Sequence, residues 1–101
     1  MPKYYIAVQV KKEFADRHAG DPNYIRHLMQ DIWWHGHHAM KGIEDKGNGL
    51  WWIAYDDLET ARRDFDTKSR YTSRTRFVHD FEHAEIVNES GAVVEALQLP
   101  V

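Results

Sequence analysis

The chain has 101 residues, of which 43% are hydrophobic, and a formal net charge of −3. This length allows one hydrophobic core, so one domain over residues 1–101 is expected, and the hydrophobic share excludes an intrinsically disordered chain. The sequence has no cysteine, which excludes disulfides, thiolate metal ligands and thiol nucleophiles.

The sequence also indicates the cellular compartment of the protein. The lack of cysteine favours a reducing environment, and a cytoplasmic location is predicted. No apolar segment follows the N-terminus as it would in a secretory signal, and no apolar run reaches the length of a membrane span. We therefore expect no membrane partner.

The N-terminal part is predicted to contain a strand and a helix. Residues 4–10 (YYIAVQV) form an apolar, alternating run that predicts a strand, and the polar stretch after it predicts a loop with a short turn of helix at most. Asp21 and Pro22 are typical of the N-cap and first position of a helix. This helix either ends at Gly36 or continues to residue 40.

A β-hairpin is predicted next. Residues 45–49 (DKGNG) are a strong turn signal, and residues 50–55 (LWWIAY) are the clearest strand of the chain. Because such a turn joins two strands, residues 39–44 are predicted to form the other arm of the hairpin.

A second helix is predicted to begin at Asp56. Asp56 would be its N-cap, with Glu59 three residues later in a capping-box arrangement. Glu59 and Arg63 are spaced for an ion pair across one helical turn. The helix is expected to end between Lys68 and Thr72.

The C-terminal part is predicted to contain two strands. Residues 73–81 fit both a helix and an extended chain, whereas residues 82–88 read as a strand. Residues 88–91 then form a turn, and residues 92–99 return as a last strand. The order is therefore β-α-β-β-α-β with one extra C-terminal strand. This is the order of the ferredoxin-like plait, an α+β fold.

A plait packs both helices on one face of its sheet, so the other face of the sheet is normally exposed to solvent. Both alternating sets of side chains in residues 50–55 are apolar, which predicts an aromatic patch on the uncovered face. A symmetric homodimer through this face is expected, and the C-terminal hairpin or a ligand are the alternative covers. The predicted interface residues are Tyr5, Trp51, Ile53 and Tyr55.

Histidine is the unusual polar residue, with seven in the chain. Several lie at spacings of four residues, which would bring imidazole and carboxylate groups together on one helix face or one side of a strand. Such a cluster could bind Zn, Ni or Cu, although no cofactor is expected and a solvated helix face explains the same pattern. The metal candidates are His27, Asp31, His35, His37, His38, His79 and His83, and the candidates for a catalytic base are His35 and His79.

Residues 62–76 form a basic segment with a local balance of +4, from six basic and two acidic residues, whereas residues 77–101 contain five acids and no lysine or arginine. Such asymmetry can orient a partner, and a solvated surface is the alternative interpretation. Arginines interleaved with aromatics could also contact single-stranded nucleic acid. The predicted contact residues are Arg62, Arg63, Arg70, Tyr71, Arg74 and Arg76.

These features predict a small non-enzymatic binding or regulatory module that acts through protein–protein contacts. Its size and acidity are typical of the inhibitors that phages and mobile elements encode. An alternative is an enzyme or metal-binding protein of the dimeric α+β-barrel type, with His35 or His79 in a pocket lined by Trp33, Trp34, Trp51, Trp52 and Tyr55. The second alternative is an RNA- or single-stranded-DNA-binding module that uses residues 62–76.

Overall fold

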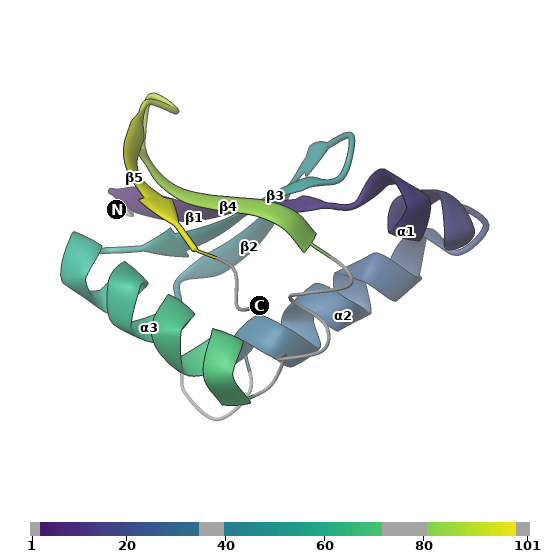
Figure 1. Cartoon of the computed structure of the whole chain (residues 1–101), viewed down its shortest axis with the longest axis horizontal. Coiled ribbons are helices and arrows are strands. Elements are labelled where there is room, and N and C mark those ends of the chain that lie inside the picture. Colours follow the sequence, from purple (N-terminus) through teal and green to yellow (C-terminus); the bar gives the residue numbers. More distant parts are fainter. Residues whose placement is uncertain (1–2, 35–39, 72–80, 99–101) are drawn as a thin grey trace.

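Five antiparallel strands form one open sheet, which with three helices makes a small α+β domain in the part of the chain that the structure describes (Figure 1). The computed structural model describes residues 3–34, 40–71 and 81–98. The strands are β1 (Tyr4–Val10), β2 (Gly42–Gly47), β3 (Leu50–Tyr55), β4 (Phe81–Asn88) and β5 (Val93–Leu97), in the order β2-β3-β1-β4-β5. The helices are α1 (Lys12–Arg17), α2 (Pro22–Trp34) and α3 (Leu58–Tyr71).

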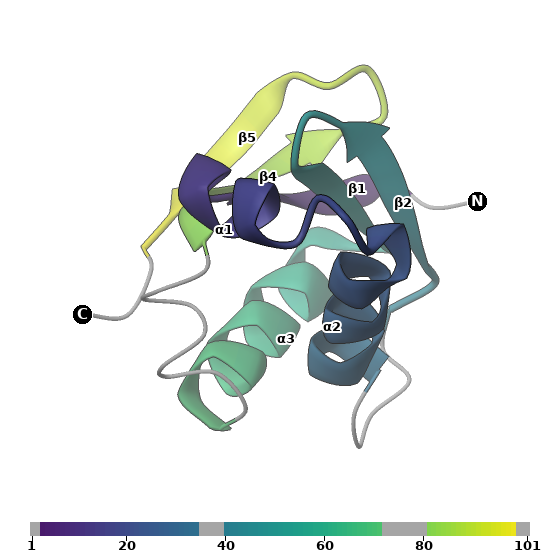
Figure 2. The ribbon, with the colours of Figure 1, turned by 90° about the vertical axis from the view of Figure 1, so that its right-hand side faces the viewer.

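Helices α2 and α3 lie together on one face of the sheet, and α1 lies beyond the end of β1 (Figures 1 and 2). The core is the layer between the sheet and these two helices. In the sheet, Ile6 of β1 lies between its pairing partners Ile53 of β3 and Ile86 of β4, and all three side chains are fully buried. Met29 and Trp33 of α2 are also fully buried there. Burial of this apolar layer is the main stabilising contribution to the fold.

The strands agree closely with the sequence-based prediction. β1 and β3 have the predicted bounds, and they pair with each other inside the sheet. The last two strands are β4 and β5, close to the predicted ranges of 82–88 and 92–99. Residues 72–80, on which the ambiguous part of the prediction falls, lie outside the described residues, and Phe81 begins β4.

The hairpin between β2 and β3 is present, but its first arm is displaced along the sequence. β2 is Gly42–Gly47 rather than residues 39–44, and the turn is formed by Asn48 and Gly49. Both turn residues have positive φ, 55° and 80°, as a two-residue hairpin turn with an Asn-Gly pair requires. The Gln9 side chain donates a hydrogen bond of 2.9 Å to the Asn48 carbonyl oxygen, which fixes this turn beside β1.

The first residues of α2 and α3 can be compared with the predicted helix caps. α2 begins at Pro22 as predicted, whereas its end past Trp34 falls outside the described residues. For α3 the predicted N-cap, Asp56, is wrong by one residue. The N-cap is Asp57, whose Oδ1 accepts a 2.8 Å hydrogen bond from the Thr60 backbone N–H and whose Oδ2 accepts one of 2.9 Å from the Thr60 hydroxyl. Helix α1 is the short turn of helix that was anticipated after β1.

We expect replacement of the N-cap by alanine, Asp57→Ala, to lower the urea midpoint at neutral pH. The backbone and hydroxyl hydrogen bonds from Thr60 lower the pKa of Asp57 below its ordinary value of 3.8. A carboxyl group whose pKa is lower in the folded state stabilises the protein above its unfolded-state pKa, and this contribution disappears as the pH falls through the folded-state pKa. The difference between wild type and Asp57→Ala should therefore shrink on acidification.

Two variants serve as controls for this prediction. Asn is also a good N-cap, so Asp57→Asn should keep most of the neutral-pH stability but lose the acid dependence. Asp56 contacts Lys41 at 3.6 Å on the exposed surface, so Asp56→Ala should cost less than Asp57→Ala. A larger loss for Asp56→Ala would contradict the assignment of the cap.

Candidate functional site

The sheet face opposite α2 and α3 is the first candidate surface. Tyr5 of β1 and Trp52 of β3 are half-buried on this face, with ring centroids 4.8 Å apart. Lys46 of β2 places its Nζ 4.4 Å from the centroid of the Trp52 ring. The turn between β4 and β5 also curls over this side of the sheet (Figure 1). A Cβ at Gly91 would lie 3.7 Å from Trp52 Cη2, so the chain's own hairpin covers part of the face.

Three of the four predicted interface residues lie on the other face. Trp51, Ile53 and Tyr55 are at most 4% exposed and belong to the core beneath the helices, so their assignment to the uncovered face is wrong. Side chains alternate along a strand, and the register places Trp51 beside Val8 on the helix-covered side. Of the four, only Tyr5 lies on the uncovered face.

The same alternation separates the aromatic residues of the predicted pocket. Trp33, Trp51 and Tyr55 are buried in the core, whereas Trp52 projects from the opposite face of β3. The side chain of Trp34 lies outside the described part of the structure. The described aromatics therefore fill the core and the outer face separately, and they do not line one common pocket.

Charged residues flank the aromatic pair on the uncovered face. One row of paired residues crosses this face of the sheet from β2 to β5. It places a glutamate on each side of Trp52 and an alanine at β5. This row consists of Glu44, Trp52, Ala7, Glu85 and Ala96. His83 lies on the same face, where its Nε2 is 3.3 Å from Glu85 Oε2. The uncovered face is thus a small aromatic centre within a polar surround.

The two edge strands of the sheet differ in character. β2 contains three consecutive charged residues, Glu44, Asp45 and Lys46, between two glycines, and charge is a common protection against edge-to-edge pairing. β5 has the sequence VVEAL, and Val93 and Val94 are 57% and 42% exposed. Among the described strands, β5 pairs only with β4, so its outer backbone edge is not used by any of them. The β5 edge is therefore the more accessible apolar edge of this sheet.

Arg62 of α3 is attached to this edge strand. Its Nε donates a 2.8 Å hydrogen bond to Glu95 Oε1, and its Nη2 lies 2.6 Å from the same oxygen. Glu59 Oε2 lies 3.5 Å from Arg62 Nη1, one turn earlier in the helix. The hydrogen bond to Glu95 raises the pKa of Arg62. Sequence reasoning assigned Arg62 to an external partner, but this contact commits it to β5.

The other predicted contact residues are less fully placed. Arg63 is exposed on α3, whereas the side chains of Arg70 and Tyr71, and the residues Arg74 and Arg76, lie outside what the structure describes. Binding by this basic segment remains a prediction. Its first arginine already has a carboxylate partner within the domain.

The histidine candidates are not brought together in the described residues. His27 is exposed on α2 and His83 lies on the sheet, while the Asp31 side chain, His35, His37, His38 and His79 are outside the described part. Within residues 3–34, 40–71 and 81–98, no three His, Asp or Glu side chains gather in a metal-binding arrangement. The predicted metal ligands and the catalytic histidines therefore remain predictions.

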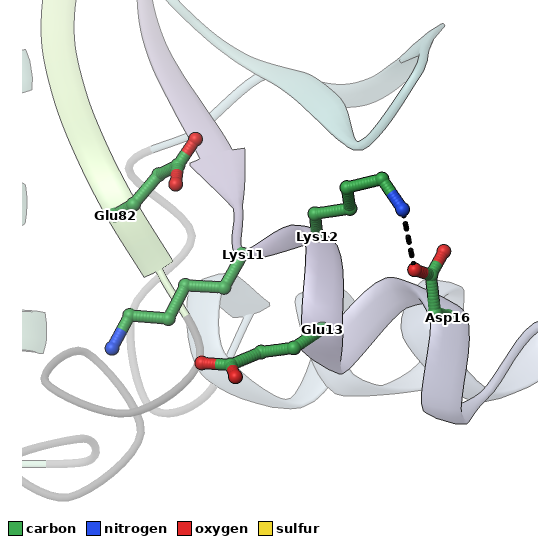
Figure 3. A pocket seen from close by; sticks show the side chains of 5 residues that line it. All are labelled: Lys11, Lys12, Glu13, Asp16 and Glu82. Carbon is green, nitrogen blue, oxygen red and sulfur yellow. Dashed lines mark hydrogen bonds and ion pairs between the residues drawn. The ribbon is translucent and has the colours of Figure 1, made fainter.

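An open polar pocket lies at the end of the sheet (Figure 3). It has a volume of about 490 Å³ and is lined by side chains from the end of β1, from α1 and from the start of β4, namely Lys11, Lys12, Glu13, Asp16 and Glu82. An adjoining pocket of about 400 Å³ extends it toward the Asn48–Gly49 turn. Lys12 Nζ donates a 2.7 Å hydrogen bond to Asp16 Oδ2, which raises the pKa of Lys12. A lysine with a raised pKa stays protonated at neutral pH, so Lys12 is neither a base nor a nucleophile there.

A buried polar pair joins the sheet to α3. The Tyr55 hydroxyl donates a short hydrogen bond to Asp64 Oδ2, and both residues are buried. Burial, and secondarily the charge of Asp64, raise the pKa of Tyr55. Tyr55 therefore acts as a hydrogen-bond donor and not as a base. Sequence reasoning missed this pair, although Asp64 lies within the apolar stripe of α3 formed by Ala61 and Phe65, a position where an unpaired acid would be costly.

Comparisons with known proteins found no match: not among family models, not among curated proteins and not among solved structures. None of the described helices combines the length and the apolarity needed to cross a membrane. The candidate site therefore rests on the chain's own surface. Its clearest features are the apolar β5 edge and the Tyr5–Trp52 pair of the adjoining sheet face.

Proposed function

We propose that this protein is a small non-enzymatic binding or regulatory module that acts through protein–protein contacts, with strand β5 and the adjoining sheet face as its contact surface. The observation that carries the proposal is the contrast between the two edges, charged at β2 and apolar at β5. An open strand edge offers backbone N–H and C=O groups that another β-strand can pair with, and exposed valines add apolar contact.

The proposal includes a fold assignment. The strand order β2-β3-β1-β4 and the helices on one face support a ferredoxin-like plait, to which β5 adds a fifth strand beside β4. In this arrangement the added strand, rather than β4, forms one edge of the sheet. The contact surface of the module would therefore be the part that the extra strand contributes.

Charge on the uncovered face favours a protein partner over a nucleic acid. Tyr5 and Trp52 could stack on bases, but Glu44 and Glu85 flank them in the sheet and would repel phosphates. Lys46 already lies over the Trp52 ring. A partner that supplies backbone hydrogen bonds and small apolar side chains fits this surface better.

Photo-crosslinking tests the proposal directly. A photo-reactive amino acid in place of Val94 should give discrete covalent protein adducts in cells that express the chain. The same group in place of Glu13, on α1 at the polar pocket, should give none above background. A lack of adducts at Val94, or equal adducts at both positions, would contradict a contact surface at β5. Either a second copy or another protein in the Val94 adduct is consistent with the proposed function.

A further inference from the structure

We infer that the partner of the β5 edge is a second copy of this chain, whose β5 pairs antiparallel with the first around a two-fold axis at Glu95. The two sheets would then continue into each other, with the helices of both copies on the same side. This inference rests on the proposed protein-binding function and names its partner. It differs from the dimer expected from the sequence, which packs sheet face on sheet face.

The polarity of β5 is self-complementary. In an antiparallel pair centred on Glu95, Val94 lies opposite Ala96 of the second copy, and the reverse contact follows from the symmetry. The apolar contact across the axis is therefore the one between Val94 and Ala96, because Val93 pairs with Val87 on the uncovered face, whereas Leu97 pairs with Ala84 on the helix side. The irregularity in the pairing of β5 with β4 lies at the Val93 end, between the partners of Ile86 and Val87, and leaves Glu95 to Leu97 in regular register.

The one charged residue of β5 is already neutralised. Two carboxylates opposite each other would repel, but each Glu95 accepts a hydrogen bond from Arg62 of its own α3. The symmetric pair would bring two arginines and two glutamates together on the helix side of the joined sheet. Opposite charges in equal number make this cluster favourable to association, and Arg62 is the residue that permits it.

The other edge strand does not offer such a pairing. Glu44, Asp45 and Lys46 occupy consecutive positions of β2, and its two glycines supply no side chains for cross-strand contact. Of the two edges, only β5 is apolar and self-complementary. This contrast favours a closed dimer, because β5–β5 pairing leaves two charged β2 edges at the ends of the joined sheet.

Sedimentation velocity over a concentration series tests the inference. The wild type should shift from monomer to dimer as its concentration rises from low micromolar toward millimolar. Val94→Lys adds a charge at the proposed contact and should weaken dimerisation at least about tenfold, as a like charge introduced into a strand edge opposes pairing. Gly42→Lys adds the same charge to β2, at a position where an added Cβ meets no atom within 4 Å, and should leave dimerisation unchanged.

Exchange of charges tests the role of Arg62. Arg62→Gln should weaken dimerisation, since two unneutralised Glu95 carboxylates then face each other, and high salt should reduce this defect. The double variant Arg62→Gln with Glu95→Gln should restore dimerisation, which a merely destabilised α3 would not do. Thermal unfolding of each variant monitors the fold independently.

A cysteine trap tests the register. The chain has no cysteine, so Glu95→Cys introduces one thiol per copy without background. Residues opposite each other in adjacent strands lie within the range that a disulfide spans, so Glu95→Cys should form a covalent dimer on mild oxidation. Val93→Cys, which places the thiol away from the two-fold axis, should form little covalent dimer.

The outcomes separate this inference from the proposed function. A strictly monomeric wild type, or a dimer that is insensitive to Val94→Lys and not trapped by Glu95→Cys, overturns β5–β5 pairing. Adducts at Val94 with a different protein alone would also overturn it, yet they would support the proposed binding function. The absence of any adduct at Val94, together with a monomer, would contradict both.

Discussion

Replacement of Trp51 by alanine is expected to lower the free energy of unfolding by about 3–5 kcal/mol, the usual cost of truncating a buried tryptophan. Trp51 is 4% exposed in the core layer between β3 and the helices. Its loss leaves a cavity, because the paired strands on either side of β3 hold the backbone in place. Since domains of this kind are stabilised by about 5–15 kcal/mol in total, the urea midpoint should fall markedly. Urea unfolding followed by circular dichroism measures the change.

The neighbouring tryptophan provides a matched control. Trp52 is half-buried on the opposite face, against Tyr5 and Lys46, so Trp52→Ala removes less buried surface. We expect a loss of about 1–2 kcal/mol, within the ordinary range for partly exposed positions. An equal or larger loss for Trp52→Ala would contradict the assignment of Trp51 to the core and Trp52 to the outer face.

Trp51 and Trp52 also show which feature of the sheet could not be predicted from the sequence. The apolar run of residues 50–55 after the turn signal predicted the bounds of β3 correctly, but both faces of this strand are apolar. Which face the helices cover depends on the volumes of side chains in the neighbouring strands. On the outer face, Ala7 and Ala54 are small and nearly buried beside the larger Tyr5 and Trp52 rings. No local pattern in the sequence shows that these large side chains shield small ones across the sheet.

Contacts between distant segments could not be predicted from the sequence, for a similar reason. The start of α3 was predicted to within one residue because capping is local, although the sequence predicted Asp56 rather than Asp57 as the N-cap. The contact of Arg62 with Glu95 spans 33 positions and depends on β5 lying above α3. The basic segment could therefore be recognised, whereas the internal partner of its first arginine could not. The candidate site followed from strand order, which only the assembled sheet shows.

The buried hydrogen bond between Tyr55 and Asp64 should be a second large contribution to stability. We expect Tyr55→Phe to lower the free energy of unfolding by about 1.5–3 kcal/mol, the range for hydrogen bonds to charged groups. The variant keeps the ring in the core, but it removes the hydroxyl that donates to Asp64 Oδ2. A buried carboxylate that loses a donor bears part of its desolvation cost. Urea unfolding at neutral pH measures the effect.

Alkaline pH separates the hydroxyl's contribution from a packing defect. The pKa of Tyr55 is raised above its ordinary value of 10.0 by burial and by Asp64. An acid group whose pKa is raised on folding contributes stability that is fully present below the unfolded pKa and is lost as the pH rises above it. From this site the wild type should lose about 1.4 kcal/mol per pH unit above that value, as long as the folded tyrosine stays protonated. Tyr55→Phe lacks this loss, so its deficit should narrow with rising pH, whereas Tyr24→Phe, at an exposed ring, should retain the wild-type dependence. A deficit that is constant with pH would mean that the phenylalanine variant is destabilised by packing alone and that the Tyr55 hydroxyl titrates in the folded protein as it does in water.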